Sequence, residues 1–218
     1  MMRVAVSLVL LLALSIALQA EEPVYFADPT LQALVERQLW VTSPTPEDML
    51  ALTSLDASIR DIFDITGLEF AVNLQELLLG ENRISDISPL AGLNRLSMLI
   101  LNNNQIADVS PLSGLTNLRY LDIHENCIGD IAPLVSLVNL ETLNAYSNDI
   151  HDVSALSGMT RLQTLMLSSN HVNDVSPLSG LSRLRVLLLR GNDITDISPL
   201  LSLTLLDGLS LQDNPLRN

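Results

Sequence analysis

The sequence predicts an α/β solenoid, in which one short structural unit is stacked many times along an axis. Three observations support this fold class: a 22-residue period from Leu52 onward, a strand-like alternation within each period, and a helical pattern ahead of the first one. Repeats at a fixed period are typical of folds whose neighbouring units bury one continuous core. With 218 residues and 48% hydrophobic side chains, the chain is long enough for such a core.

The repeat is strict, because rows of 22 residues follow one another without an insertion. Each row follows L-x-x-L-x-L-x-x-N-x-I-x-D-I-x-P-L-x-x-L-x-x with aliphatic exchanges, and the eighth row is incomplete. The rows begin at Leu52, Leu74, Leu96, Leu118, Leu140, Leu162, Leu184 and Leu206. We therefore assign residues 52–218 to one repeat domain.

Each row is expected to hold a strand of about three residues followed by a turn. In residues 77–79 and 121–123, the first and third side chains share one face, as in any strand. The returning segment carries paired leucines such as Leu90 and Leu93, whose burial favours a turn of 3₁₀ helix.

Asparagine occupies the ninth position of every row except the first, where Arg60 stands instead. An amide side chain both donates and accepts hydrogen bonds, so a ladder of amides satisfies backbone groups where the chain leaves each strand. The seven residues are Asn82, Asn104, Asn126, Asn148, Asn170, Asn192 and Asn214. We interpret this ladder as structural.

Aspartate recurs at the thirteenth position of seven rows, as Asp64, Asp86, Asp108, Asp130, Asp152, Asp174 and Asp196. Carboxylates are the ligands that calcium prefers, which suggests a calcium ladder. The alternative is that each aspartate accepts backbone N–H groups at a turn, as in the Asp-Ile-Ser-Pro-Leu segment of residues 86–90. A calcium site would need ligands from several rows, so we favour the structural role and assign no metal ligand.

These rows resemble the 22-residue leucine-rich repeats of bacterial internalin-like proteins, with the Asp-Ile-Ser-Pro-Leu segment as the most specific fragment. The resemblance covers residues 52–218 and implies a leucine-rich-repeat solenoid: a right-handed horseshoe with a parallel concave β-sheet and convex 3₁₀ helices or turns. The departures are Arg60, and Gly67 and Ala155 in place of proline. No Ig-like domain or cell-wall sorting signal follows the last row, so covalent surface attachment is not expected.

Residues 21–51 are predicted to form an α-helical N-terminal cap. Asp28-Pro29 is typical of a helix start, a second start follows at residues 45–48, and leucines recur between them at helical spacing. The segment from Phe26 to Leu31 resembles the stretch that precedes the repeats of internalin-like proteins. Because a solenoid must cover its first apolar layer, we place Trp40 in the core of the cap.

Residues 1–20 have the pattern of a cleavable signal peptide: Arg3, an apolar run over residues 4–18, and the small residue Ala20. The run is shorter than the roughly twenty residues of a membrane-spanning helix, which favours cleavage over an uncleaved anchor. We therefore expect a secreted, periplasmic or cell-surface protein with no membrane partner after cleavage. Cys127 is the only cysteine, which excludes an internal disulfide and a cysteine-based zinc cluster, and we expect it to be inert.

The chain is strongly acidic, with 25 acidic residues against 11 basic ones, all of them arginine. A net charge of −14 repels phosphate backbones, so nucleic acid is not an expected partner. The sequence also lacks a G-x-S-x-G elbow, a phosphate-binding glycine loop and an H-E-x-x-H pair. We expect no enzyme activity, no catalytic residue and no cofactor.

The candidate binding surface is the set of strand side chains that face the concave side. Two of the chain's three tyrosines fall there in adjacent rows, and amphipathic aromatics are typical interface anchors. Apolar side chains surround them where a solvated sheet would carry charges, which indicates a contact surface unless neighbouring strands simply shade them. The predicted binding residues are Tyr120, Asp122, His124, Glu125, Asn144, Tyr146, Met98, Ile100, Met166 and Leu188.

The expected function is therefore that of an extracytoplasmic module that binds a protein, or a glycan, on its concave face. One alternative is a structural or self-assembling surface component, because Leu209 and Leu211 lie near an unpaired edge of the uncapped last row. Another is a small metal or general-base cluster of Asp122, His124 and Glu125, although a hydrogen-bonding contact to a ligand is the simpler use of His124.

Overall fold

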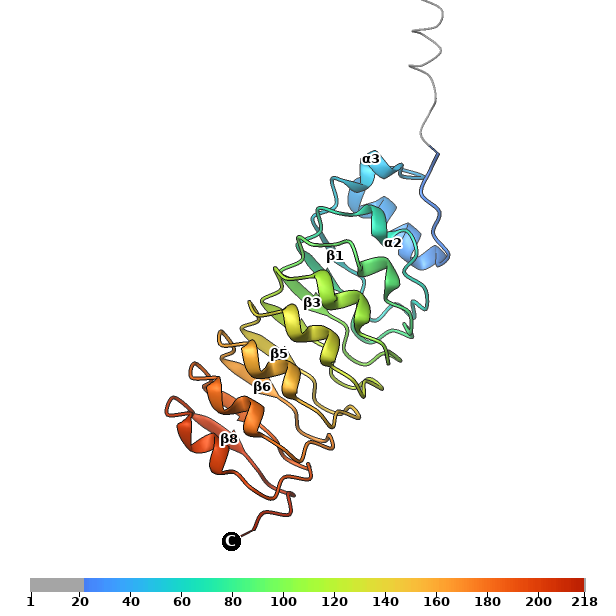
Figure 1. Ribbon diagram of the computed structural model, residues 1–218. Helices are drawn as coiled ribbons and strands as arrows, with labels where there is room; N and C mark the ends of the chain where they lie inside the picture. The colour runs from blue at the N-terminus through green and yellow to red at the C-terminus, as the bar shows by residue number, and fades with distance from the viewer. Residues whose placement is uncertain (1–21, 218) are drawn as a thin grey trace, which may run out of the picture.

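The computed structural model describes residues 22–217, with a helical segment at one end and a regular stack of rows below it (Figure 1). The expected signal peptide, residues 1–20, lies outside the described residues. Helices α2 (Pro29–Leu39) and α3 (Pro46–Met49) come first, and the strands and 3₁₀ helices of the rows then alternate along the chain. Among residues 22–217, no helix is long and apolar enough to span a lipid bilayer.

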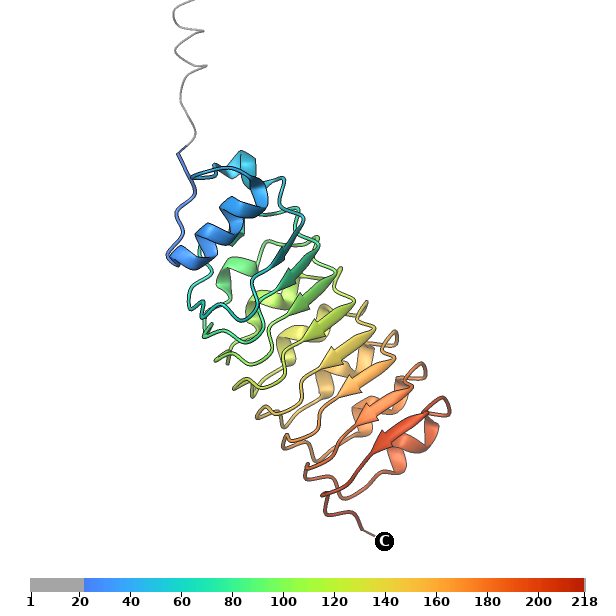
Figure 2. The same cartoon turned by 180° about the vertical axis from the view of Figure 1, so that it is seen from behind.

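The strands form one eight-stranded parallel sheet in chain order, as the resemblance implied (Figure 2). Each strand is three residues long, and its neighbour in the sheet lies 22 residues further on, as in the pairing of Leu77 with Leu99. The strands are β1 (Ser54–Asp56), β2 (Glu76–Leu78), β3 (Met98–Ile100), β4 (Tyr120–Asp122), β5 (Thr142–Asn144), β6 (Thr164–Met166), β7 (Val186–Leu188) and β8 (Gly208–Ser210).

The 3₁₀ helices cover the other side of the stack, toward the viewer in Figure 1. They are η1 (Leu68–Phe70), η2 (Ser88–Leu90), η3 (Ser110–Gly114), η4 (Ala132–Ser136), η5 (Ser154–Gly158), η6 (Ser176–Gly180) and η7 (Ser198–Ser202). At η3 the Asp108 carboxylate accepts the backbone N–H of Ser110 at 2.8 Å and its hydroxyl at 2.9 Å. The first of these bonds recurs at all seven predicted aspartates, so their structural role at the turns is confirmed.

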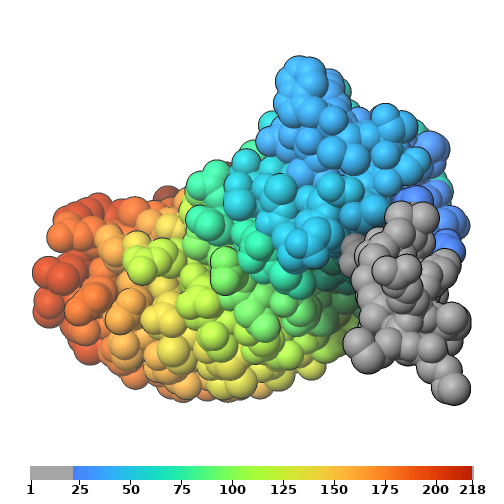
Figure 3. Space-filling view, turned by 90° about the horizontal axis from the view of Figure 1, so that it is seen from above, coloured from blue at the N-terminus to red at the C-terminus, as the bar shows by residue number. Residues whose placement is uncertain are grey.

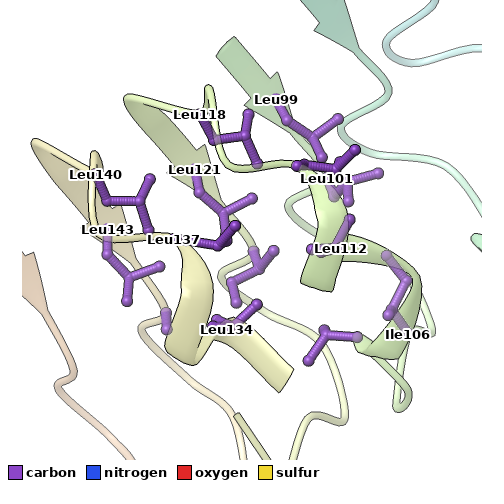
Figure 4. Packing of buried hydrophobic residues seen from close by; sticks show 14 of the residues in the cluster. Leu99, Leu101, Ile106, Leu112, Leu118, Leu121, Leu134, Leu137, Leu140 and Leu143 are labelled. Carbon is purple, nitrogen blue, oxygen red and sulfur yellow. The ribbon is translucent and has the colours of Figure 1, made fainter. Parts of the chain in front are cut away.

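A single apolar core runs between the sheet and the 3₁₀ helices (Figure 4). Leu121 and Leu143 of neighbouring strands point inward, and Leu112 and Leu134 of η3 and η4 meet them from the opposite side. All four side chains are fully buried. Each row therefore completes its core only with its neighbours, and this fixes the orientation of every outward side chain.

The asparagine ladder bonds each row to the one before it. The side-chain oxygen of Asn126 accepts the N–H of Ile106 at 3.0 Å. Its amide nitrogen donates to Leu101 of the preceding row at 3.0 Å, and to the carbonyls of Ile123 and His124 at 3.1 and 3.2 Å. These bonds confirm the structural interpretation of the ladder.

The helical segment is bonded to the first row by Asp28, the residue that precedes α2. The Asp28 carboxylate caps α2 by accepting the N–H groups of Thr30 and Leu31, at 2.8 and 3.1 Å, while its second oxygen accepts the N–H of Phe63 at 3.2 Å. The space-filling view from this end shows the segment packed against the first rows (Figure 3). One buried carboxylate thus holds both the helix and the row that it covers.

Our placement of Trp40 in a buried core is wrong, because its side chain is 92% exposed. Trp40 is the residue at which the chain leaves α2, and its φ of 57° lies in the left-handed region. That conformation ends the helix before the residue joins the inward face. Leu31, Val35 and Met49 fill the first apolar layer instead.

Gly67 stands where most rows have proline, and the docked segment explains why. Its φ is +104°, and a Cβ at this position would lie 2.6 Å from Cδ1 of Phe26. The departure from the repeat therefore makes room for the aromatic ring that precedes α2.

Candidate binding surface

The parallel register aligns five of the predicted binding residues in one line across the sheet. We call this set, Ile100, Asp122, Asn144, Met166 and Leu188, the strand-face column; its members are successive register partners on β3 to β7. Asp122 is 7% exposed, whereas the others are half-buried. The column thus has apolar side chains at both ends and a polar centre.

Asp122 and His124 form that polar centre. Nδ1 of His124 lies 2.6 Å from Oδ1 of Asp122, and the backbone N–H of His124 donates to the same oxygen at 3.2 Å. The amide of Asn144 donates to the other oxygen at 3.3 Å, so the buried carboxylate is fully satisfied. In the neutral tautomer that donates from Nδ1 to this carboxylate, Nε2 of His124 is an acceptor for a ligand.

The two tyrosines lie on either side of this centre. The ring of Tyr146 is 6.3 Å from that of His124, centroid to centroid, with a tilt of 42° between the planes. Tyr120 on β4 is half-buried, and burial, with the charge of Asp122 as a smaller cause, raises the pKa of its hydroxyl. Tyr120 therefore remains protonated at neutral pH and is able to donate a hydrogen bond.

The remaining predicted residues are placed differently. Met98 pairs with Tyr120 across β3 and β4 and extends the apolar part of the surface. Glu125 lies beyond the strand, exposed, with a φ of 52°, and does not contact Asp122 or His124 through a hydrogen bond of its side chain. Within residues 22–217, no group of three or more His, Cys, Asp and Glu side chains is arranged to hold a metal ion.

The structure also has a hollow of about 650 Å³ that our sequence reasoning missed. It lies in the loops after β1 to β3 and is lined by Ile59, Arg60, Asp61, Glu81, Asn82 and Arg83, among others. Arg60, the single break in the asparagine ladder, was the signal in the sequence that pointed to this place.

A parallel sheet of identical rows, joined by an asparagine ladder and backed by 3₁₀ helices, defines a leucine-rich-repeat protein. The family model described as Leucine Rich repeats (2 copies) matches residues 94–136 and 138–180. An Arabidopsis thaliana receptor kinase ectodomain, 24% identical with a TM-score of 0.65, shows the same fold over 71% of this chain and 20% of its own. A search of curated proteins finds no match.

Two internalin structures from Listeria monocytogenes are more similar. Internalin inlF is 37% identical with a TM-score of 0.86, and internalin inlC2 is 36% identical with a TM-score of 0.85. Each covers 88% of this chain, which in turn spans 58% of the inlF chain and 87% of the inlC2 chain. The chain belongs to the internalin family of leucine-rich-repeat proteins.

Proposed function

We propose that this internalin-family chain is an extracytoplasmic module that binds a protein partner on the concave face of its sheet, over the strand-face column. The observation that supports this most is the continuous line of half-buried side chains around the Asp122–His124 pair. The fold is compatible with such a use, since the Arabidopsis ectodomain is described in complex with CASPARIAN STRIP INTEGRITY FACTOR 2.

The chemistry of the surface suggests how a partner would be held. Ile100 and Met166 offer apolar area on either side of the polar centre, and burying apolar area contributes roughly 25 cal/mol per Å². Tyr146 is 38% exposed beside His124, so its ring is available while its backbone is fixed in the row. Rigid amphipathic rings lose little conformational entropy on binding, which makes tyrosines effective anchors.

The experiment is alanine substitution at both tyrosines, after a partner has been isolated from the extracellular or periplasmic fraction with this protein as bait. Tyr120→Ala and Tyr146→Ala should each weaken the binding free energy by about 2 kcal/mol or more. Ser110→Ala, on η3 at the opposite side of the stack, is the matched control and should have almost no effect. Full affinity in both tyrosine variants, with loss in convex-side variants, would place recognition elsewhere. A captured glycan in place of a protein would revise the partner class.

A second candidate is self-association through β8. Within the described residues β8 pairs only with β7, and Leu209 is 46% exposed whereas its counterpart Leu187 is fully buried. Unpaired strand edges are templates for pairing with another chain.

A further inference from the structure

The hollow in the loops after β1 to β3 is separate from the strand-face column. These loops lie along the edge toward which the strand arrowheads point in Figure 2. The residues that line the hollow come from the first three rows, and none of them belongs to the predicted binding surface. The hollow is shallow and open to solvent: its volume is about 650 Å³, and the side chains of Arg83 and Asp61 are each 65% exposed.

Arg60 supplies a free cation to this hollow. Its backbone N–H donates to the side-chain oxygen of Asn82 at 3.1 Å, so the ladder of the next row holds its main chain in place. Its guanidinium makes no hydrogen bond or ion pair with any residue in the range 22–217. An arginine in place of the ladder asparagine thus adds a charge that the fold does not use.

Arg83 adds a second guanidinium that is only partly engaged. Its Nε lies 2.5 Å from Oδ1 of Asp61, which uses one edge of the planar group. The edge formed by the two terminal nitrogens remains open, and that edge matches the two oxygens of a carboxylate. Two arginine forks therefore line the same hollow.

The other lining residues supply an acid and an apolar surface. The Glu81 carboxylate forms no ion pair within the described part of the chain, whereas the amide of Asn82 is occupied by the carbonyls of Ala57, Leu79 and Gly80. Ile59 is 66% exposed. The hollow thus offers one free cation, a second guanidinium that is paired with Asp61, one free carboxylate and one apolar side chain.

The backbone at Ile59 is strained for a β-branched residue. Its φ is 58°, and the same position of the later rows carries Glu81, Asn103, Glu125, Ser147, Ser169, Gly191 and Asp213, none of them β-branched. The left-handed region is strongly disfavoured for β-branched side chains. An exposed isoleucine in this conformation adds nothing to the core, and strained residues of this kind are concentrated at functional sites.

We propose that this hollow binds a zwitterionic amino acid or short peptide. The carboxylate of the ligand bridges Arg60 and the open edge of Arg83, its ammonium group pairs with Glu81, and its apolar side chain packs on Ile59. The carboxylates of Glu81 and Asp61 decide against a phosphate, because a dianion with no positive group of its own would be repelled by both.

The test is titration of the purified protein with the dipeptide Gly-Leu, followed by calorimetry or by NMR shifts of the row-one and row-two amides. Gly-Leu should bind, while Gly-Leu amide and N-acetyl-Gly-Leu, each lacking one charge, should bind about tenfold more weakly or not at all. Arg60→Gln should weaken the binding of Gly-Leu about as much as amidation of its carboxylate does. Glu81→Gln should weaken it about as much as acetylation of its ammonium group does. Arg161→Gln, at an exposed arginine remote from the hollow, is the control and should bind normally.

Absence of Gly-Leu binding at millimolar concentration would overturn the proposal, as would equal affinity in the Arg60→Gln, Glu81→Gln and Arg161→Gln proteins. Inorganic phosphate binding more tightly than Gly-Leu would replace the zwitterion with a simple anion and also overturn it. Unchanged thermal unfolding of the variants shows that they fold. Tyr120→Ala should leave dipeptide binding intact, so this result is independent of the strand-face proposal.

Discussion

At the scale of single residues, the ladder asparagines carry out the same task in the second to the eighth row. Asn126 accepts a bond from the preceding row and donates to both the preceding row and its own. Its partners are the backbone N–H of Ile106 and three backbone carbonyls, and a buried polar group without a partner is costly. Loss of the amide leaves the N–H of Ile106 without a partner, whereas the three carbonyls each keep a second donor.

Replacing Asn126 with alanine should lower the free energy of unfolding by about 1–3 kcal/mol, measured by urea denaturation. Asn102→Ala is a suitable control, since the amide of Asn102 lies on the surface of the sheet and carries no comparable set of backbone bonds. Unchanged stability of the Asn126 variant together with loss of ligand binding would show that the ladder is a site and not a scaffold.

The hydrogen bonds of Asp108 predict a specific dependence of stability on pH. The backbone N–H of Ser110, and to a smaller extent its hydroxyl, hold the pKa of Asp108 below its ordinary value. A carboxyl whose pKa is lower in the folded than in the unfolded state stabilises the fold above the unfolded pKa, and this contribution is lost as pH falls through the folded pKa.

Asp108→Ala should therefore lose stability less steeply than the parent when the pH falls below about 4. Ser110→Ala, which removes the hydroxyl but keeps the backbone donor, should fall between the two. Urea denaturation over a pH series measures the effect. Parallel stability profiles for the parent and Asp108→Ala would mean that this carboxylate contributes nothing through ionisation.

At the scale of elements, the helical segment and the first row are adapted to each other. Gly67 replaces the proline of other rows because the ring of Phe26 occupies the space of a side chain, and Asp28 bonds to both parts. The helical segment does not follow the repeat, and the row that it contacts therefore departs from the repeat at Gly67.

Gly67→Ala should destabilise the protein by about 1–3 kcal/mol, because the added methyl group overlaps Phe26 and the φ of +104° disfavours any side chain. Gly92→Ala is the matched control, since a Cβ there meets no atom within 4 Å. Thermal or urea unfolding compares the two variants. Equal stabilities would indicate that the segment shifts away from the first row at no cost.

The repeated elements were predictable because their periodicity is visible in the sequence. The way in which α2 ends was not predictable. Hydrophobic spacing correctly indicates that Leu31, Leu34 and Val35 face inward. The orientation of Trp40 depends on the left-handed residue that ends the helix, which is a backbone property that no apolar pattern encodes.

Part of the candidate site could also be predicted from the sequence, and part could not. The row position of Tyr120 and Tyr146 fixes which face they share, so their neighbourhood on the sheet could be predicted. The bond between Asp122 and His124 depends on side-chain rotamers, and the hollow depends on left-handed backbone at Ile59 and Asp61. Neither follows from a consensus that treats all rows as equal.

At the scale of the whole molecule, β8 is an end strand of the sheet and pairs only with β7 among residues 22–217. Replacing Ser210 and Gln212 with lysine should leave the monomer folded and suppress self-association, because charged side chains on an edge strand oppose pairing with another chain. Light scattering over a range of concentrations measures this. If the parent protein is monomeric throughout that range, the self-association hypothesis is withdrawn.

Because the rows have a uniform length, the length of the solenoid is set by the number of rows. Inserting or deleting one row of 22 residues moves everything beyond it by one strand spacing, about 4.8 Å, and leaves the ladder and the register of the remaining rows intact. Gene duplication in units of 66 base pairs, three for each residue of a row, would lengthen the concave surface in discrete steps. Copying a row thus changes the span of the sheet while every residue of the existing rows stays the same.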